Sequence, residues 1–89
     1  MQVAVVKEKE KEETISEREA IEKAILHSIA RHRISPSNIL AVDIIDRGWG
    51  PWEVRIYLKG SPIAIYADVE RDTGKVCSRI VELIPDPGY

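Results

Sequence analysis

The chain has 89 residues and a net charge of −2, from 13 basic and 15 acidic residues. A chain of this length buries only about 60–65% of the surface that its unfolded form exposes, so we expect one small domain with little room for an internal active-site cavity. Nucleic-acid and membrane-surface binding both favour an excess or stripe of basic residues, and the charge balance predicts neither kind of partner.

The apolar residues favour a sheet, because they include 13 Ile and 8 Val and no Phe. Amides are scarce (Gln2 and Asn38) while 31% of residues are charged, a combination that fits a thermophile source. The start carries no basic segment ahead of an apolar run, and no stretch approaches the roughly 20 apolar residues of a membrane span, so we expect a cytoplasmic protein. Cys77 is the single cysteine of the chain, so an internal disulfide is excluded. Its position in an apolar strand pattern predicts a buried, inert thiol.

Residues 1–13 are expected to precede the domain, which the sequence places at 14–89. Residues 7–13 alternate Lys and Glu without an apolar position, which is typical of a solvated tail. Gln2 to Val6 reads either as a short edge strand or as a loose end.

The clearest predicted element is an amphipathic helix from Ser16 to Arg33. Ser16 is followed three residues later by Glu19, the spacing of a reciprocal capping box. At 100° per residue one face of this helix gathers five apolar or small side chains, suited to covering a sheet. They are Ile21, Ala24, Ile25, Ser28 and Ile29. Ser35 and Pro36 then end the helix.

Three or four antiparallel strands are predicted after Pro36. Their expected ranges are Leu40 to Asp46, Trp52 to Lys59, Ile63 to Glu70 and Val76 to Ile84. The second alternates apolar and polar positions, as a half-buried strand does. Short turns containing Gly separate the strands, which predicts a β-meander. The expected fold class is therefore α+β, with one helix packed on a three- to four-stranded antiparallel sheet.

From about Thr14 to Glu82 the chain resembles the PepSY domain, a module of one helix followed by antiparallel strands. The resemblance rests on the helix start Ile15–Ile21, on the strand Trp52–Lys59 with its continuation into Ala64–Val69, and on the hairpin Asp72-Thr73-Gly74-Lys75-Val76, which is similar to the family's Asp-x-x-Thr-Gly-x-Val. It implies a non-catalytic binding or regulatory module, of the kind found in peptidase propeptides and in stand-alone proteins.

Five residues are candidates for binding a protein partner. They are Trp49, Trp52, Arg55, Tyr57 and Tyr66. Trp49 lies between two glycines in a predicted turn, where it either presents an exposed contact or folds back over the end of the core. Trp52 begins a strand and also fits the core. The other three fall on the outward phase of their strands. An aromatic and basic sheet face can stack single-stranded nucleic acid, but cross-strand ion pairs are the simpler explanation, and a second subunit that covers the face is the alternative.

His27 and His32 are five residues apart, about 140° around a helix, so we expect no shared metal ion, and His32 reads as a packing residue with one hydrogen bond. No nucleophile–base pair, carboxylate pair or phosphate-binding glycine loop has the required spacing. We therefore predict no enzyme, no cofactor and no metal, but an interaction or regulatory module that binds a protein. The alternative is a structural or assembly subunit that associates with itself, as a homodimer for example, through its sheet face or edge.

Overall fold

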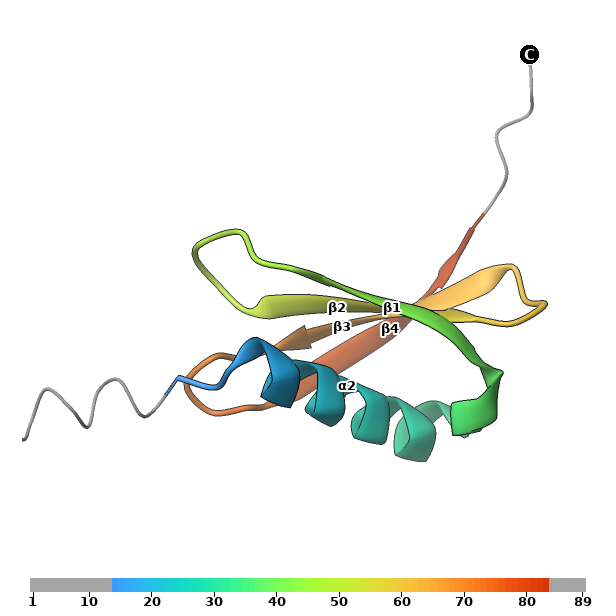
Figure 1. Cartoon of the computed structure of the whole chain (residues 1–89), viewed down its shortest axis with the longest axis horizontal. Coiled ribbons are helices and arrows are strands. Elements are labelled where there is room, and N and C mark those ends of the chain that lie inside the picture. The colour runs from blue at the N-terminus through green and yellow to red at the C-terminus, as the bar shows by residue number, and fades with distance from the viewer. Residues whose placement is uncertain (1–13, 84–89) are drawn as a thin grey trace, which may run out of the picture.

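The computed structural model describes residues 14–83, and these form one helix packed across one face of a four-stranded antiparallel sheet (Figure 1). The predicted α+β class is confirmed. The elements are α2 (Glu17–His32), the short 3-10 helix η1 (Pro36–Asn38), β1 (Ile39–Ile45), β2 (Trp52–Leu58), β3 (Ile63–Val69) and β4 (Val76–Glu82). The predicted tail or strand within residues 1–13 and the last predicted strand residue, Ile84, lie outside the described residues.

Local signals fix both ends of α2. The Ser16 hydroxyl accepts a hydrogen bond from the Glu19 amide at 3.2 Å, and the Glu19 carboxylate accepts one from the Ser16 amide at 3.1 Å. This capping box satisfies amides that a helix start leaves without partners. Arg33 ends the helix in the left-handed conformation, with φ 56°.

The sheet order is β1-β2-β3-β4, the predicted meander. β2 and β3 occupy the centre and each pair with two strands, whereas β1 and β4 form the edges. The β1–β2 register shifts between Ile39 and Ala41, which marks a bulge or irregularity near the start of β1. The β3–β4 register runs without a shift from Ile63↔Glu82 to Val69↔Val76.

The core lies between α2 and the two central strands. Its largest fully buried apolar side chains belong to β2 and β3: Val54, Ile56, Ile65 and Val69. The helix contributes small residues at a spacing of four, Ala20, Ala24 and Ser28, all fully buried. The predicted helix face was therefore only partly right. The predicted face omitted Ala20, which is fully buried. Ile21 and Ile29 are only half-buried, because α2 contacts the sheet along its row of small side chains.

The opposite side of the sheet is not covered by α2 (Figure 1). We call it the helix-free face. Cross-strand pairing arranges the residues of this face in rows that run across the four strands. The first row is Ala41, Tyr57, Ala64 and Val81, and the second is Asp43, Arg55, Tyr66 and Arg79. The third is Ile45, Glu53, Asp68 and Cys77. Cys77 is exposed, which corrects the expectation of a buried thiol. It lies on an edge strand, on the face that α2 does not cover.

Within residues 14–83, no helix is both long and apolar enough to cross a membrane.

Candidate partner-binding site

The loop between β1 and β2, residues 46–51, presents an exposed tryptophan. The Trp49 side chain is 72% exposed, the largest value among the exposed large apolar residues. The loop rises on the side of the sheet away from α2 (Figure 1). Trp49 therefore does not fold back over the core, and of the two alternatives that the sequence left open the structure retains the exposed one. We call residues 46–51 the Trp49 loop.

Arg71, from the β3–β4 hairpin, holds the base of the Trp49 loop. Its guanidinium donates to the Asp46 carboxylate at 2.6 Å and to the Gly50 carbonyl at 2.7 Å. The Gly48 amide donates to the same Asp46 carboxylate at 2.8 Å. The hydrogen bonds from Arg71 and from the Gly48 amide hold the pKa of Asp46 below its usual value. The loop is thus tied at its first and fifth residues while Trp49 stays free of the core.

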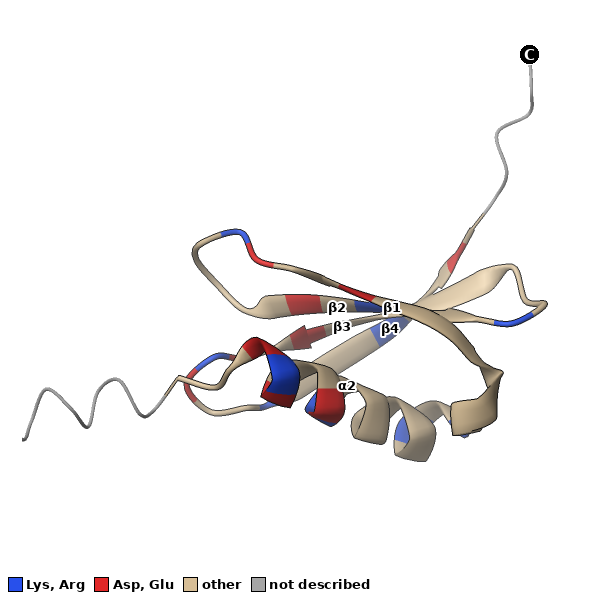
Figure 2. Ribbon diagram, viewed as in Figure 1, with Lys and Arg blue, Asp and Glu red and all other residues tan. Residues whose placement is uncertain are grey.

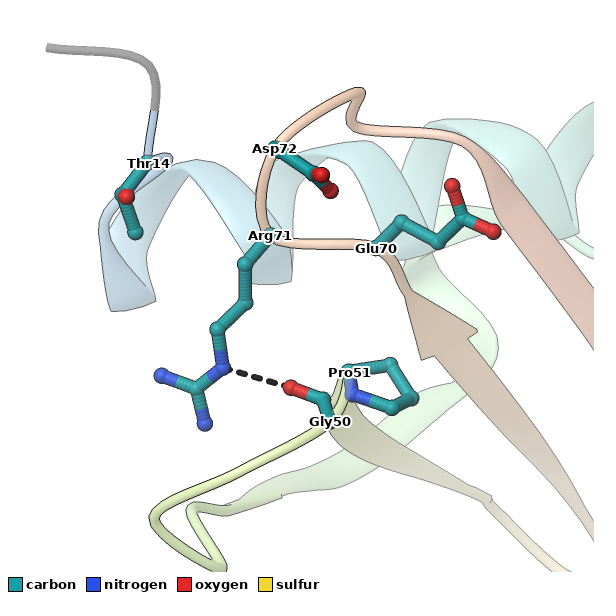
Figure 3. A pocket seen from close by; sticks show the side chains of 6 residues that line it. All are labelled: Thr14, Gly50, Pro51, Glu70, Arg71 and Asp72. Carbon is teal, nitrogen blue, oxygen red and sulfur yellow. Dashed lines mark hydrogen bonds between the residues drawn. The ribbon is translucent and has the colours of Figure 1, made fainter. Parts of the chain in front are cut away.

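A hollow of about 460 Å³ lies beside this tie (Figure 3). Its lining residues are Thr14, Gly50, Pro51, Glu70, Arg71 and Asp72. In Figure 3 the Arg71 guanidinium points toward Gly50, where its hydrogen bond lies, rather than into free space. Arg71, the cationic residue that lines this hollow, is therefore already hydrogen-bonded to the Trp49 loop.

Trp52 has a different role from Trp49. It is only 8% exposed, and its indole N–H donates to the Ile15 carbonyl at 3.2 Å. The guanidinium of Arg71 lies over its ring, 3.9 Å from the centroid. Trp52 therefore joins the segment before α2 to the sheet and offers a partner almost no surface.

A buried carboxylate connects the Trp49 loop to the helix-free face. Glu53 is 4% exposed and forms ion pairs with Arg47 of the loop and with Arg55, the latter at 2.9 Å. Burial pushes the pKa of Glu53 upward, but the hydrogen bonds and charges of Arg55 and Arg47 outweigh it and leave this pKa below its usual value. The Glu53 hydrogen bond raises the pKa of Arg55, although burial opposes it.

The structure brings Arg55, Tyr57 and Tyr66 together on the helix-free face. Tyr66 is opposite Arg55 on one side and Arg79 on the other, and both guanidinium groups lie over its ring, at 4.7 Å and 5.4 Å from the centroid. Tyr57 belongs to the neighbouring row. Arg79 was not among the candidates predicted from the sequence, although its alternation within β4 places it in the phase of this face.

His27 and His32 come closer together than their spacing suggested. The Nε2 atoms of both imidazoles lie within hydrogen-bond distance of the Ser78 hydroxyl, at 3.1 Å and 2.9 Å. Burial, the charge of Arg31 and the charge of His27 lower the pKa of His32. Residues 14–83 contain no group of three or more His, Cys, Asp or Glu side chains arranged to hold a metal ion. Through Ser78, the two histidines thus connect the C-terminal part of α2 to β4.

Comparison of the chain with protein-family models, with curated proteins and with solved structures finds no match. The resemblance to the PepSY domain therefore stays a prediction.

Proposed function

We propose that the chain is a non-catalytic protein-interaction module whose partner docks on the Trp49 loop. One observation carries the proposal: a 72% exposed indole on a loop whose base is tied down by hydrogen bonds. Tryptophan is among the residues that most often dominate protein interfaces, because it combines a large apolar area with a polar N–H.

The ties to Arg71 support the proposal on energetic grounds. A loop that is ordered only on binding spends part of the contact energy on its own ordering, about 0.5–1.5 kcal/mol for each immobilised side chain. The Gly48 amide donates to the Asp46 carboxylate and the Gly50 carbonyl accepts from Arg71, so the backbone on either side of Trp49 has fixed contacts before a partner arrives. The exposed indole thus resembles a preorganised anchor.

Paired affinity captures with Trp49→Ala and Leu40→Ala test this proposal. Leu40 is a matched control, since it is a 65% exposed large apolar residue outside the loop. We expect partners captured by the wild-type chain and by Leu40→Ala to be lost with Trp49→Ala. If all three chains capture the same partners equally well, the loop is not the docking site.

Regulation of a peptidase, which the PepSY resemblance implies, is the narrower form of this proposal. We infer that it acts by binding, so adding the purified chain to a candidate peptidase should change the rate of peptide hydrolysis, and Trp49→Ala should weaken that change. Location in the cytoplasm and a thermophile source are further proposals, checked by cell fractionation and by a thermal melting curve.

A second candidate function is that of an assembly subunit, a homodimer for example, which buries the helix-free face against another copy. Tyr57, Tyr66 and Val81, each partly exposed, give this face an aromatic and apolar area that α2 does not cover. So small a core would gain stability from such burial. Sedimentation over a wide range of concentrations tests it: a strict monomer at the highest concentration eliminates self-assembly.

A further inference from the structure

The second edge of the sheet, β4, has a regular pairing register. It pairs with β3 over seven consecutive residue pairs without a register shift, and it has no other strand neighbour among residues 14–83. The opposite edge strand, β1, carries a register shift near its start. Irregular edges resist the addition of a further strand, whereas an edge with regular pairing accepts it more readily. β4 is therefore the edge better suited to accept one.

The ladder hydrogen bonds show which backbone groups of β4 have no ladder partner within residues 14–83. Leu83 donates its amide to the Pro62 carbonyl at 2.6 Å, and Glu70 donates to the Lys75 carbonyl at 2.9 Å, both in the β3–β4 register. Hydrogen-bonded pairs alternate along an antiparallel ladder, so the odd-numbered residues of β4 bond to β3. The N–H and C=O groups that point away from the sheet belong to Val76, Ser78, Ile80 and Glu82.

A row of basic side chains on α2 runs beside this edge. Lys23, His27 and Arg31 are spaced by four residues and so lie along one side of the helix. The Lys23 stem lies against the β3–β4 hairpin, since a Cβ placed on Gly74 would be 2.9 Å from its Cε. His27 bonds Ser78, and Arg31 joins both in lining a hollow of about 260 Å³ against β4.

Further cations flank the edge on the helix-free side. Arg79 lies in β4 on this face, and Lys75 directly precedes β4 in the same alternating phase. Glu82 is the one carboxylate within β4, and Figure 2 shows an acidic position only near the C-terminal end of this strand. Within residues 14–83, Lys23, Arg31, Lys75 and Arg79 form no ion pair, whereas Arg47, Arg55 and Arg71 are all paired. Within residues 14–83, no ion pair thus offsets the charge of these four side chains.

We propose that the β4 edge docks an extended, acidic segment of a partner protein, which joins the sheet as a fifth strand. The outward N–H and C=O groups of β4 supply the main-chain hydrogen bonds, and the flanking cations select acidic side chains at alternate positions. The hollow beside Ser78 receives one such carboxylate close to Arg31 and His27. This site is separate from the Trp49 loop and does not depend on the function proposed for it.

The same charges argue against a second copy of the chain at this edge. Two β4 strands pairing edge to edge would bring Lys23, Arg31 and Arg79 toward the same cations of the other copy. Juxtaposed like charges oppose an interface, so the arrangement favours an acidic partner over self-association.

Three capped heptapeptides test the proposal at low salt: one alternating Glu and Val, one alternating Lys and Val, and the acidic peptide with its central Val replaced by Pro. We expect the acidic peptide to bind at least about tenfold more tightly than the other two. Its amide chemical-shift changes should centre on Val76, Ser78 and Ile80, with slowed hydrogen exchange there. Equal binding of the acidic and basic peptides, or shifts confined to β1 or the helix-free face, would overturn the proposal.

Charge reversal provides the matched comparison. The double variant Lys23→Glu/Arg31→Glu should lose acidic-peptide binding about tenfold and gain the basic peptide. Arg18→Glu/Lys59→Glu carries the same net change, but Arg18 lies on the opposite side of α2 from His27 and Lys59 follows β2, so it should bind as the wild type does. If both double variants lose acidic-peptide binding equally, net charge alone explains the loss and the proposed site is wrong. Trp49→Ala should bind the acidic peptide normally, which separates this result from the fate of the Trp49 loop.

Discussion

Arg71 lies over the indole ring of Trp52, with its guanidinium carbon 3.9 Å from the ring centroid. The same guanidinium bonds Asp46 and the Gly50 carbonyl, and the Arg71 carbonyl accepts a hydrogen bond from the Ile15 amide at 2.8 Å. One residue of the β3–β4 hairpin therefore connects the segment before α2, the core tryptophan and the exposed loop. The two tryptophans are three residues apart, yet one is held in the core by Arg71 and the other is exposed on the loop that Arg71 anchors.

Replacing Arg71 with Ala should lower the free energy of unfolding by about 1–2 kcal/mol, from the lost cation–π contact and a partly exposed ion pair. Urea unfolding followed by tryptophan fluorescence measures the change. Arg18→Ala is the control, because Arg18 is exposed and forms no ion pair with the described residues. Faster hydrogen exchange at the Gly48 amide should accompany Arg71→Ala only. Unchanged exchange there would mean that Arg71 does not hold the loop.

Replacing Glu53 with Gln should destabilise the fold near neutral pH by about 1–3 kcal/mol, because two arginines lose their buried carboxylate while the shape is kept. The pKa of Glu53 is depressed in the folded chain, so its contribution is complete above its ordinary value of 4.5 and is lost as the pH falls through the lower folded value. The stability difference between wild type and Glu53→Gln should therefore shrink in acid. Urea titrations between about pH 2 and 7 measure it, and a difference independent of pH would contradict the ion-pair account.

The lowered pKa of His32 predicts a second pH dependence with its own window. The folded chain favours the neutral imidazole, so the unfolded chain takes up more protons as the pH falls below the ordinary value of 6.5. Stability should be complete above that value and decrease below it, and His32→Gln should reduce this slope. Urea unfolding from about pH 5 to 8 reports the slope, and NMR titration of the imidazole protons reports the pKa directly. A folded pKa above 6.5 would reverse the predicted sign.

Ser28→Ala should stabilise the chain by about 1 kcal/mol. The Ser28 hydroxyl is fully buried in α2 and has no hydrogen-bond partner among the described residues. Removing a buried hydroxyl without a partner relieves its desolvation cost, and Ala has the higher helix propensity. Thermal or urea unfolding measures the change, with Ser37→Ala in the exposed 3-10 helix as a control expected to change little. Destabilisation by Ser28→Ala would show that a water or an alternative rotamer satisfies the hydroxyl.

Local interactions let the sequence determine the elements of this fold. The capping box of Ser16 and Glu19 closes within one helical turn, so its spacing was sufficient to place the helix start. The alternation from Trp52 to Leu58 needs only the period of a strand, and the short turns after it leave little alternative to a meander. These features predicted the α+β class and the strand limits to within one or two residues.

Contacts between distant segments decided the rest. The position of the Trp49 loop, which leaves its indole exposed, is held by hydrogen bonds from Arg71, about 20 residues later in the chain. The meeting of His27 and His32 depends on Ser78, which the β3–β4 register brings under the end of α2. The exposure of Cys77 follows from the edge position of β4. No periodicity within a single element specifies such pairings, because they are set by how the layers pack; the elements come from the sequence, and the surfaces come only from the tertiary structure.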